Sequence, residues 1–244
     1  MEPNALYYGD NLDILRKYIS DESVDLIYLD PPFNSNATYN TIFKDESGNS
    51  TDAQLVAFDD TWHWGPDAES KYLYLTNTAY HQGKVPSPVS DLIGAFHSGI
   101  KPSPMLAYLV EMAVRLVELR RVLKPTGSLY LHCDSVASHY LRVALDAIFG
   151  PEHFRSEITW KRTSSHGNVT SSYGDVTDTI LYYAAGDSPT WNQVFVPYTE
   201  KHVATKFTGV DPDGRRFTTT DLRNPGYRPN LIYDYKGYKP HPNG

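Results

Sequence analysis

The residues best suited to chemistry are Asp30-Pro31-Pro32-Phe33, which follow the apolar run of residues 24–29. That run has the length and the β-branched and aromatic content of a buried parallel strand. The Asp30 carboxylate is therefore expected at the carboxyl end of a strand, where open α/β sheets bind ligands. The two prolines fix two φ angles and lack backbone donors, which leaves the neighbouring carbonyl oxygens free to accept hydrogen bonds from a ligand.

An exocyclic amino group on a flat base would suit these four residues. Asp30 can accept one of its two hydrogens and a backbone carbonyl the other, which draws the nitrogen lone pair out of conjugation with the ring. The Phe33 ring supplies an apolar face on which the base can stack. The alternative is that Asp-Pro-Pro is only a turn after a strand.

The segments before Asp30 narrow these alternatives. Residues 6–8 are expected to form a short strand that breaks at Gly9, and residues 11–19 carry apolar side chains at helical spacing. Asp10 is therefore also expected at the carboxyl end of a strand. This order of segments resembles the DNA amino-methyltransferases that use S-adenosylmethionine, in the permuted group whose target-binding half comes first. The resemblance implies that Asp10 contacts the adenosine of the cofactor.

The resemblance continues along most of the chain. Four later segments resemble, in order, segments of the subgroup similar to type III restriction-modification methyltransferases: residues 58–62, 105–134, 157–162 and 178–183. The resemblance implies an α/β, Rossmann-like methyltransferase fold with a mainly parallel central sheet, incomplete at the carboxyl terminus, plus a small β-rich target-recognition region. We expect residues 1–188 to form the catalytic half of the methyltransferase domain and residues 189–244 to begin the target-recognition region.

The Gly-rich cofactor loop of this family, aromatic-x-Gly-x-Gly, does not occur in these 244 residues. In the permuted group it would come later, so we expect this chain to be the front part of a longer enzyme. The missing half would supply the two strands between the strand before Asp10 and the strand before Asp30. We therefore expect an unpaired apolar edge beside Asp30, poor binding of S-adenosylmethionine by this polypeptide alone, and a tendency to aggregate.

Composition restricts the class of protein. Hydrophobic residues make up 40% of the chain, which supports a real core, and no apolar stretch approaches the ~20 residues of a membrane span. No signal peptide is evident, and a single cysteine suits the cytoplasm. The net charge of −7 is unusual for a DNA-binding protein, although Lys and Arg exceed Asp and Glu by three in residues 199–244.

Residues 132–134, His-Cys-Asp, are expected at the same sheet edge as Asp30. The resemblance makes Cys133 a structural residue, and the alternative is a nucleophilic thiol activated by the neighbouring histidine. A metal site is not expected, because no second His or Cys stands nearby at ligand spacing.

Several residues are candidates for contact with DNA. The polar loop of residues 34–61 is expected to lie over the site, where Tyr39 and Trp62 either stack on bases or anchor the loop in the core. Lys161 and Arg162 begin a polar loop at residues 163–173 that suits phosphate or a flipped nucleotide, the alternative being a plain hairpin loop. Helical patterns cease near residue 189, and the Tyr-rich, basic region from residue 191 onward, with Arg215 and Arg216, suits target recognition.

The remaining periodic segments predict helices over residues 66–81, 89–97, 104–122 and 135–149 and strands over residues 128–132, 156–162 and 179–185. Ser135 is expected to cap the last of these helices, and Gly150-Pro151 to end it.

The reaction that the resemblance implies is methyl transfer from S-adenosylmethionine to N6 of a flipped adenine in double-stranded DNA. In the family an initial Asp in the four-residue motif is associated with adenine, and N4 of cytosine is the alternative. A catalytically idle DNA-binding or specificity fragment and an RNA or protein amino-methyltransferase are further alternatives. The expected partners are DNA and, in a full-length protein, either a second copy or a restriction subunit.

Overall fold

The computed structural model describes residues 4–31, 38–41, 55–59, 62–163, 173–174, 176–220, 226–227, 229, 232–234 and 236–239, with the backbone alone for 38–41 and 55–59. The chain divides into two compact units, Met1–Trp191 and Asn192–Gly244. Pro32, Phe33, the side chain of Tyr39 and most of the two polar loops lie outside the described residues.

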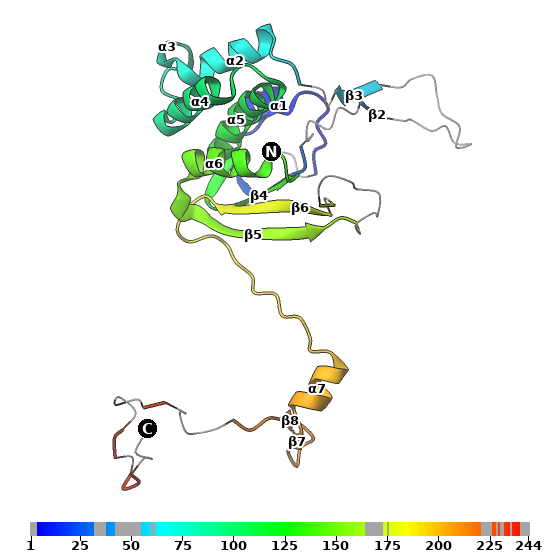
Figure 1. Ribbon diagram of the computed structural model, residues 1–244, viewed down its shortest axis with the longest axis vertical. Coiled ribbons are helices and arrows are strands. Elements are labelled where there is room, and N and C mark those ends of the chain that lie inside the picture. Colours follow the sequence, from blue (N-terminus) through cyan, green and yellow to red (C-terminus); the bar gives the residue numbers. More distant parts are fainter. Residues whose placement is uncertain are drawn as a thin grey trace, which may run out of the picture. The chain divides into compact units, whose positions relative to one another are not determined.

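The first unit contains a four-stranded sheet in the order β1-β4-β6-β5. Its strands are β1 (Val24–Leu29), β4 (Leu123–Cys133), β5 (Phe154–Lys161) and β6 (Thr177–Ala184). β1 is parallel to β4, and β6 is antiparallel to both of its neighbours, so β1, β4 and β5 share one direction (Figure 1). The predicted α/β fold is therefore confirmed, and β1 lies at the edge of the sheet as expected, but the sheet is mixed, with one parallel and two antiparallel pairings.

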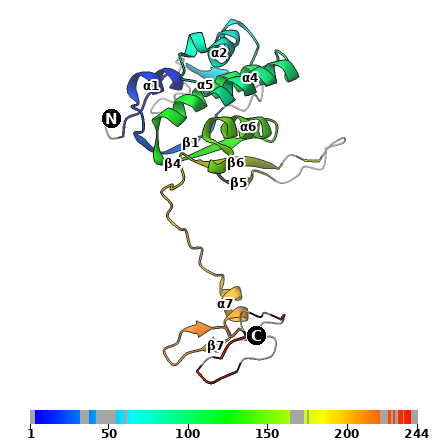
Figure 2. The ribbon, with the colours of Figure 1, turned by 90° about the vertical axis from the view of Figure 1, so that its left-hand side faces the viewer.

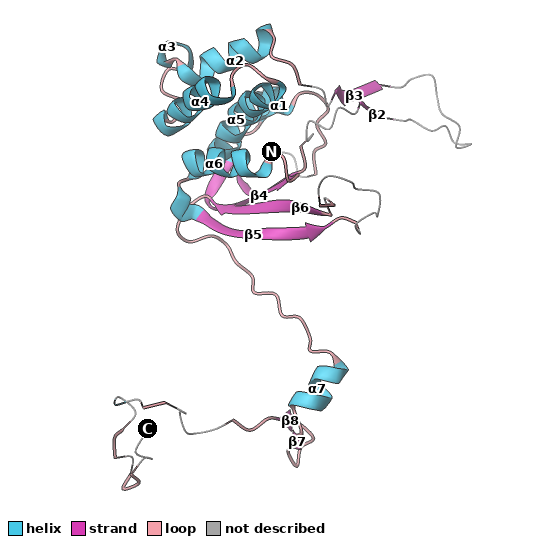
Figure 3. Cartoon of the chain, viewed as in Figure 1, coloured by secondary structure: helices cyan, strands magenta, loops and turns pink. Residues whose placement is uncertain are grey.

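Helices cover one face of this sheet (Figures 2 and 3). The longest helix, α5, is buried along most of its length, and Leu129 and Leu131 of β4 are fully buried in the same core. The core lies between α5 and the sheet because apolar side chains surround this helix on nearly every side. The helices of this unit are α1 (Asn11–Tyr18), α2 (Pro66–Thr76), α3 (Thr78–His81), α4 (Ser87–Ile100), α5 (Pro104–Val122), α6 (Ser138–Phe149) and the short 3₁₀ helix η1 (Pro151–His153).

The opposite face of the sheet carries apolar side chains that remain exposed. Leu26 and Tyr28 of β1 are 60% and 57% exposed, and Trp160 of β5 is 56% exposed. In the centre of this face Tyr130 and Tyr182 stack with their ring centroids 4.5 Å apart. Among the described helices of the first unit, none lies on this face of the sheet (Figure 2).

The predicted strand over residues 6–8 is absent. Leu6 is 97% exposed and Tyr8 is 76% exposed, and neither belongs to a sheet. A strand needs a partner for its backbone hydrogen bonds, and the described residues provide none here. Asp10 therefore follows an irregular segment rather than a strand, and it caps the amino terminus of α1.

Helix boundaries differ from the predictions where side chains compete for the backbone. The expected helix over residues 66–81 breaks at Asn77, whose Oδ1 accepts a hydrogen bond from the backbone of Ala79 and starts α3. α4 is longer than predicted, because Pro88 lies in its first turn, where its missing N–H is not needed.

The start of α6 was also predicted wrongly. Asp134, rather than Ser135, accepts hydrogen bonds from the backbone N–H groups of Val136 and Ala137 and turns the chain into the helix. The predicted end is confirmed, because Gly150 follows the last helical residue with φ of 91°.

Long-range pairing accounts for the remaining differences. β4 begins five residues earlier than predicted because Leu123 pairs with Val24 of β1. The expected irregular loop over residues 34–61 contains an antiparallel pair, β2 (Thr38–Thr41) and β3 (Leu55–Asp59).

The second unit, described by itself, contains a helix that the sequence pattern did not predict. α7 (Glu200–Lys206) begins where the Thr199 side chain accepts a hydrogen bond from the backbone of His202. A two-stranded hairpin follows, β7 (Gly209–Val210) and β8 (Arg216–Phe217). None of the described helices of the chain combines the length and the apolar character that a membrane crossing requires.

Candidate active site

Asp30 directly follows β1, and its side chain is 63% exposed. The register that pairs Tyr28 with Tyr130 and Leu29 with Leu131 continues to Asp30 beside His132. In agreement with that register, Asp30 Oδ1 lies 3.5 Å from His132 Nδ1. The carboxylate therefore points away from the packed core, at the edge of the sheet where the sequence predicts it.

His132 contacts a second carboxylate with its other nitrogen. Its Nε2 lies 3.3 Å from Oδ2 of Asp178, whose side chain is only 6% exposed. Arg162 Nη1 lies 3.3 Å from the second oxygen of the same carboxylate. Because β6 is antiparallel, its first residues lie at the carboxyl ends of the other three strands. The sheet thus brings Asp30, His132, Asp178 and Arg162 together at one edge.

Two aromatic residues border this edge. The Tyr28 hydroxyl lies 3.5 Å from His132 Nδ1, and Trp160, 56% exposed, is paired in register with Asp178. An exposed indole beside a carboxylate offers a stacking surface for a flat ring. Neither Asp178 nor Trp160 was predicted as a site residue, because their position beside each other depends on the reversed direction of β6. The polar residue within the apolar strand at residues 177–184 was the signal that could have identified Asp178.

The predicted DNA contacts in the first unit fall in different environments. Lys161 is the exposed last residue of β5, and Arg162 is paired with Asp178, so both lie at the edge that carries Asp30. Trp62 instead packs on the core, with its ring 5.8 Å from that of the fully buried Tyr108. Of the two roles considered for Trp62, the structure favours the anchor over base stacking.

Arg215 and Arg216 lie in the second unit. Arg215 is 79% exposed and forms an ion pair of 2.7 Å with Asp213 inside the β7–β8 turn. Arg216 donates a hydrogen bond to the carbonyl oxygen of Phe207 at 3.3 Å. Both side chains are exposed, which leaves their contact with DNA a prediction.

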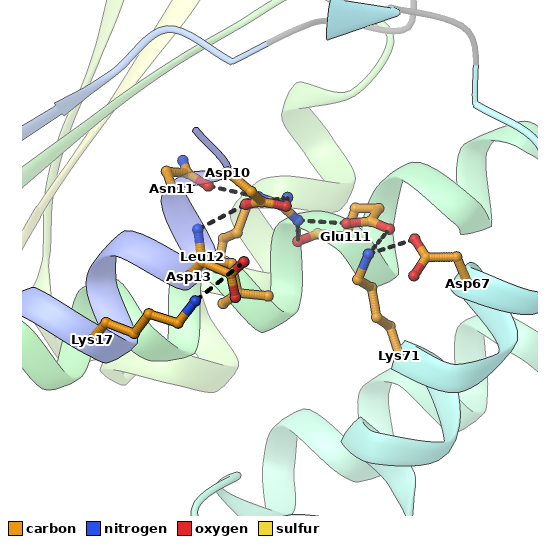
Figure 4. A network of polar contacts seen from close by, with 9 residues as sticks. Asp10, Asn11, Leu12, Asp13, Lys17, Asp67, Lys71 and Glu111 are labelled. Atoms are coloured by element: carbon orange, nitrogen blue, oxygen red, sulfur yellow. Dashed lines mark hydrogen bonds and ion pairs between the residues drawn. The ribbon is translucent and has the colours of Figure 1, made fainter. Parts of the chain in front are cut away.

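Asp10 occupies a more constrained position than the sequence predicts (Figure 4). Its Oδ1 accepts a hydrogen bond from the backbone of Leu12 at 2.8 Å. Arg115 Nη2 of α5 donates to both of its oxygens at 3.0 and 2.9 Å. A carboxylate has about four acceptor positions, so these three contacts leave about one for a ligand hydroxyl. Asp10 could therefore hold part of a cofactor, but it already has a structural role.

The network continues from Arg115 into the core (Figure 4). Arg115 and Lys71 each form an ion pair of 2.5 Å with the buried carboxylate of Glu111. Lys71 also binds Asp67 at 2.5 Å. Burial by itself lowers the pKa of Lys71, but the hydrogen bonds that Lys71 donates to Asp67 and Glu111, with the charges of these acids, outweigh it and raise the pKa above the ordinary value. This network joins α1, α2 and α5.

A second buried carboxylate lies near the amino end of β1, away from Asp30. Glu118 binds Arg16 at 3.0 Å and Arg121 at 2.7 Å beside a cavity of about 780 Å³. Burial raises the pKa of Glu118, and the hydrogen bonds and charges of Arg121 and Arg16 together lower it below the ordinary value. These pairs hold α1 against α5.

Cys133 is fully buried, and its thiol points toward the carbonyl oxygen of Thr179 at 3.4 Å. Burial raises the pKa of Cys133 to about 12, so the thiol stays protonated near neutral pH and is a poor nucleophile. The burial of Cys133 thus favours the structural role over the alternative of a catalytic thiol. Across the described residues, no three His, Cys, Asp or Glu side chains gather as metal ligands would.

The fold is that of an α/β protein, and an exposed carboxylate at the carboxyl end of a strand occupies the edge at which open α/β sheets commonly bind ligands. The chain belongs to the DNA methylase family N6_N4_Mtase, whose family model matches residues 24–240.

Individual relatives are more distant. The chain is 25% identical to the Type II methyltransferase M.EcaI of Enterobacter cloacae, over 98% of this chain and 42% of that protein. It is 28% identical to the Mod subunit of the Type III restriction-modification enzyme StyLTI of Salmonella typhimurium, over 74% of this chain and 24% of that protein. The chain thus spans less than half the length of these curated relatives. Among solved structures, a PvuII DNA methyltransferase specific for cytosine N4 superposes with a TM-score of 0.42 and 15% identity, over 75% of this chain and 49% of that chain.

Proposed function

We propose that the protein transfers a methyl group from S-adenosylmethionine to the N6 amino group of adenine in double-stranded DNA. The observation that carries the proposal is the exposed Asp30 carboxylate at the sheet edge of a chain that belongs to a DNA methylase family. Base atoms within a duplex stack are out of reach, so the target base would rotate out of the helix.

The residues near Asp30 have separate roles in this proposal. Asp30 accepts one amino hydrogen of the flipped base, and a carbonyl of Pro31 or Pro32 accepts the other, which makes the nitrogen lone pair available. Phe33 stacks on the base. When bound, S-adenosylmethionine supplies an electrophilic methyl group on a sulfonium. The remaining acceptor position of Asp10 suits a hydroxyl of the adenosine, and the held base is aligned for attack.

DNA is the proposed partner, with Lys161, Arg162, Arg215 and Arg216 as candidate phosphate contacts. In this proposal the protein acts in the cytoplasm, either as a homodimer or together with a restriction subunit. Adenine is proposed over cytosine because the four-residue motif begins with Asp, the residue associated with adenine in the resembling family.

The test is methylation of DNA by the protein together with any sequence that flanks these residues in its gene. DNA is incubated with isotopically labelled S-adenosylmethionine, digested to nucleosides and separated by mass. The expected product is labelled N6-methyladenine. Labelled N4-methylcytosine would assign the cytosine alternative, label on RNA or protein would exclude DNA as the substrate, and DNA binding without label would identify an idle binding module.

The isolated 244-residue chain allows a second measurement. β1 is an outer strand, and its exposed Leu26 and Tyr28 leave an apolar edge open to other chains. We expect calorimetry to detect little binding of S-adenosylmethionine and light scattering to detect aggregates. Micromolar affinity from a monodisperse monomer would contradict this expectation.

A further inference from the structure

We propose that His132 is a positioning residue for methyl transfer, which holds the Asp30 carboxylate in the orientation that receives the target amino group. This inference rests on the proposed function of Asp30 and adds a residue that acts through it.

The two side chains differ in rigidity. His132 belongs to β4, which is paired on both sides, and its side chain is only 16% exposed. Asp30 is 63% exposed and stands just beyond the end of an outer strand. An exposed carboxylate samples several rotamers unless a fixed neighbour selects one. His132 Nδ1, 3.5 Å from Asp30 Oδ1, is such a neighbour.

The ring of His132 is itself oriented by Asp178, which contacts the ring nitrogen that faces away from Asp30. Asp178, with a side chain 6% exposed, faces His132 Nε2 at 3.3 Å. A buried carboxylate is costly unless it is paired, and here both His132 and Arg162 approach it. A carboxylate on one ring nitrogen fixes the plane of the imidazole and directs the other nitrogen. Arg162, Asp178, His132 and Asp30 thus form one continuous polar chain across all four strands of the sheet.

The 3.5 Å contact with Asp30 is longer than an ordinary hydrogen bond. Contacts of this kind often lengthen without substrate and shorten in the reactive complex. We expect the Asp30 carboxylate to approach His132 Nδ1 when its other oxygen receives the amino hydrogen of a bound base. Tyr28, whose hydroxyl also lies 3.5 Å from Nδ1, limits how far the ring can rotate.

Two substitutions separate the two contacts of the ring. In an asparagine at this position, the amide nitrogen lies close to where Nδ1 of the histidine ring lies. In a glutamine, the amide nitrogen lies close to where Nε2 of the ring lies. His132→Asn therefore places an amide donor toward Asp30, and His132→Gln places one toward Asp178. We expect His132→Gln to lower kcat by about 10- to 100-fold, with the KM for DNA and for S-adenosylmethionine changed by less than about threefold. His132→Asn should retain the larger share of kcat although it loses the Asp178 contact.

A merely structural histidine would give a different pattern. Both variants would then lose activity only in proportion to the loss of folded protein, and Asn would rescue no better than Gln. His139→Gln is the matched control, because His139 is exposed on α6 and its ring contacts the ring of the neighbouring Tyr140 in a tilted arrangement. Its kcat and melting temperature should equal those of the wild type.

Asp30→Ala distinguishes failure of this inference from failure of the proposed function. If Asp30→Ala is inactive and folded His132→Gln turns over at the wild-type rate, the inference is overturned and the proposed function stands. If Asp30→Ala keeps the wild-type rate, the role of Asp30 is wrong.

A spectroscopic measurement does not depend on methylation at all. In nitrogen-15 correlation spectra, the Nδ1 resonance of His132 should move on Asp30→Ala, and the resonances of His139 should not. An unmoved His132 resonance would show that the two side chains do not interact and would overturn the inference.

Discussion

Asp30 and Asp10 carry the same functional group but lie in opposite surroundings. Asp30 stands at an open sheet edge and has His132 at 3.5 Å beside it. Asp10 receives three hydrogen bonds of 2.8 to 3.0 Å from Leu12 and Arg115. The carboxylate that we propose binds the substrate is left exposed, whereas fixed donors occupy most of the acceptor positions of Asp10, which joins two helices.

The polar networks connected to the two carboxylates also differ, in burial and in the distances between their members. Behind Asp10, Glu111 is paired with two cations at 2.5 Å in the core between α2 and α5. Behind Asp30, the polar chain through His132 and Asp178 has separations of 3.3 to 3.5 Å. We infer that the first region contributes mainly to stability and the second mainly to activity, and four substitutions test this division.

Asp30→Ala should have the largest effect on activity. It removes the acceptor for the amino hydrogen, so methylation should fall by at least about 10²-fold, the typical cost of removing one stabilising contact from an active site. The melting temperature should stay within about one degree, because an exposed side chain contributes little to stability. Asp25→Ala is the control: Asp25 lies on the same strand, 74% exposed, and binds Lys124. Wild-type methylation by Asp30→Ala would refute the assignment.

Glu111→Ala should have the largest effect on stability. It leaves Arg115 and Lys71 without the buried anion between them, which typically costs about 3–5 kcal/mol of unfolding free energy. Urea denaturation measures this loss. Asp67→Ala removes an acid that is 78% exposed from the same network, and it should cost less than about 1 kcal/mol. Equal costs for the two variants would show that burial does not determine the contribution.

Asp10→Ala should destabilise the fold by about 1–2 kcal/mol, because it removes a helix cap. Asp10→Asn keeps the oxygen that accepts from Leu12 and loses only the charge facing Arg115, so it should cost less. Thermal unfolding of the two variants separates the cap from the ion pair. If both variants lose equal stability, the ion pair rather than the cap is the main contribution of Asp10.

Glu118→Gln should change the pH dependence of stability, and its loss of stability relative to the wild type should be largest at neutral pH and shrink as the pH falls. The pKa of Glu118 is lowered in the fold, so its ionised form stabilises the protein above the ordinary value of 4.5, and this contribution is lost as the pH falls through the lowered pKa. Wild type should lose more stability than Glu118→Gln between about pH 5 and pH 3. Parallel stability curves for the two proteins would contradict the lowered pKa.

Local sequence patterns were sufficient to predict several elements of the fold and the position of Asp30. The apolar run before Asp30, the two prolines and the apolar residues of α5 were sufficient to predict the strand, the position of the carboxylate and the long helix. Gly150 marked the end of α6 because a positive φ favours glycine. Each of these features depends on residues that are neighbours along the chain.

The failures arise where distant residues determine the outcome. Residues 6–8 have strand composition but no partner among the described residues, and Leu123 joins β4 because Val24 pairs with it. Asp178 reaches His132 only because β6 is antiparallel to β4. The bonds between Asp10 and Arg115 span 105 residues, and no local pattern indicates them.

The proposed role of Asp30 can be tested directly with a structure of the DNA complex. The protein, with any flanking sequence of its gene, would be bound to its DNA site and to a cofactor analogue that cannot donate a methyl group. We expect a flipped adenine whose N6 lies within about 2.7–3.2 Å of an Asp30 carboxylate oxygen. A target base that remains stacked in the duplex, or a flipped base whose amino group faces away from Asp30, would contradict it.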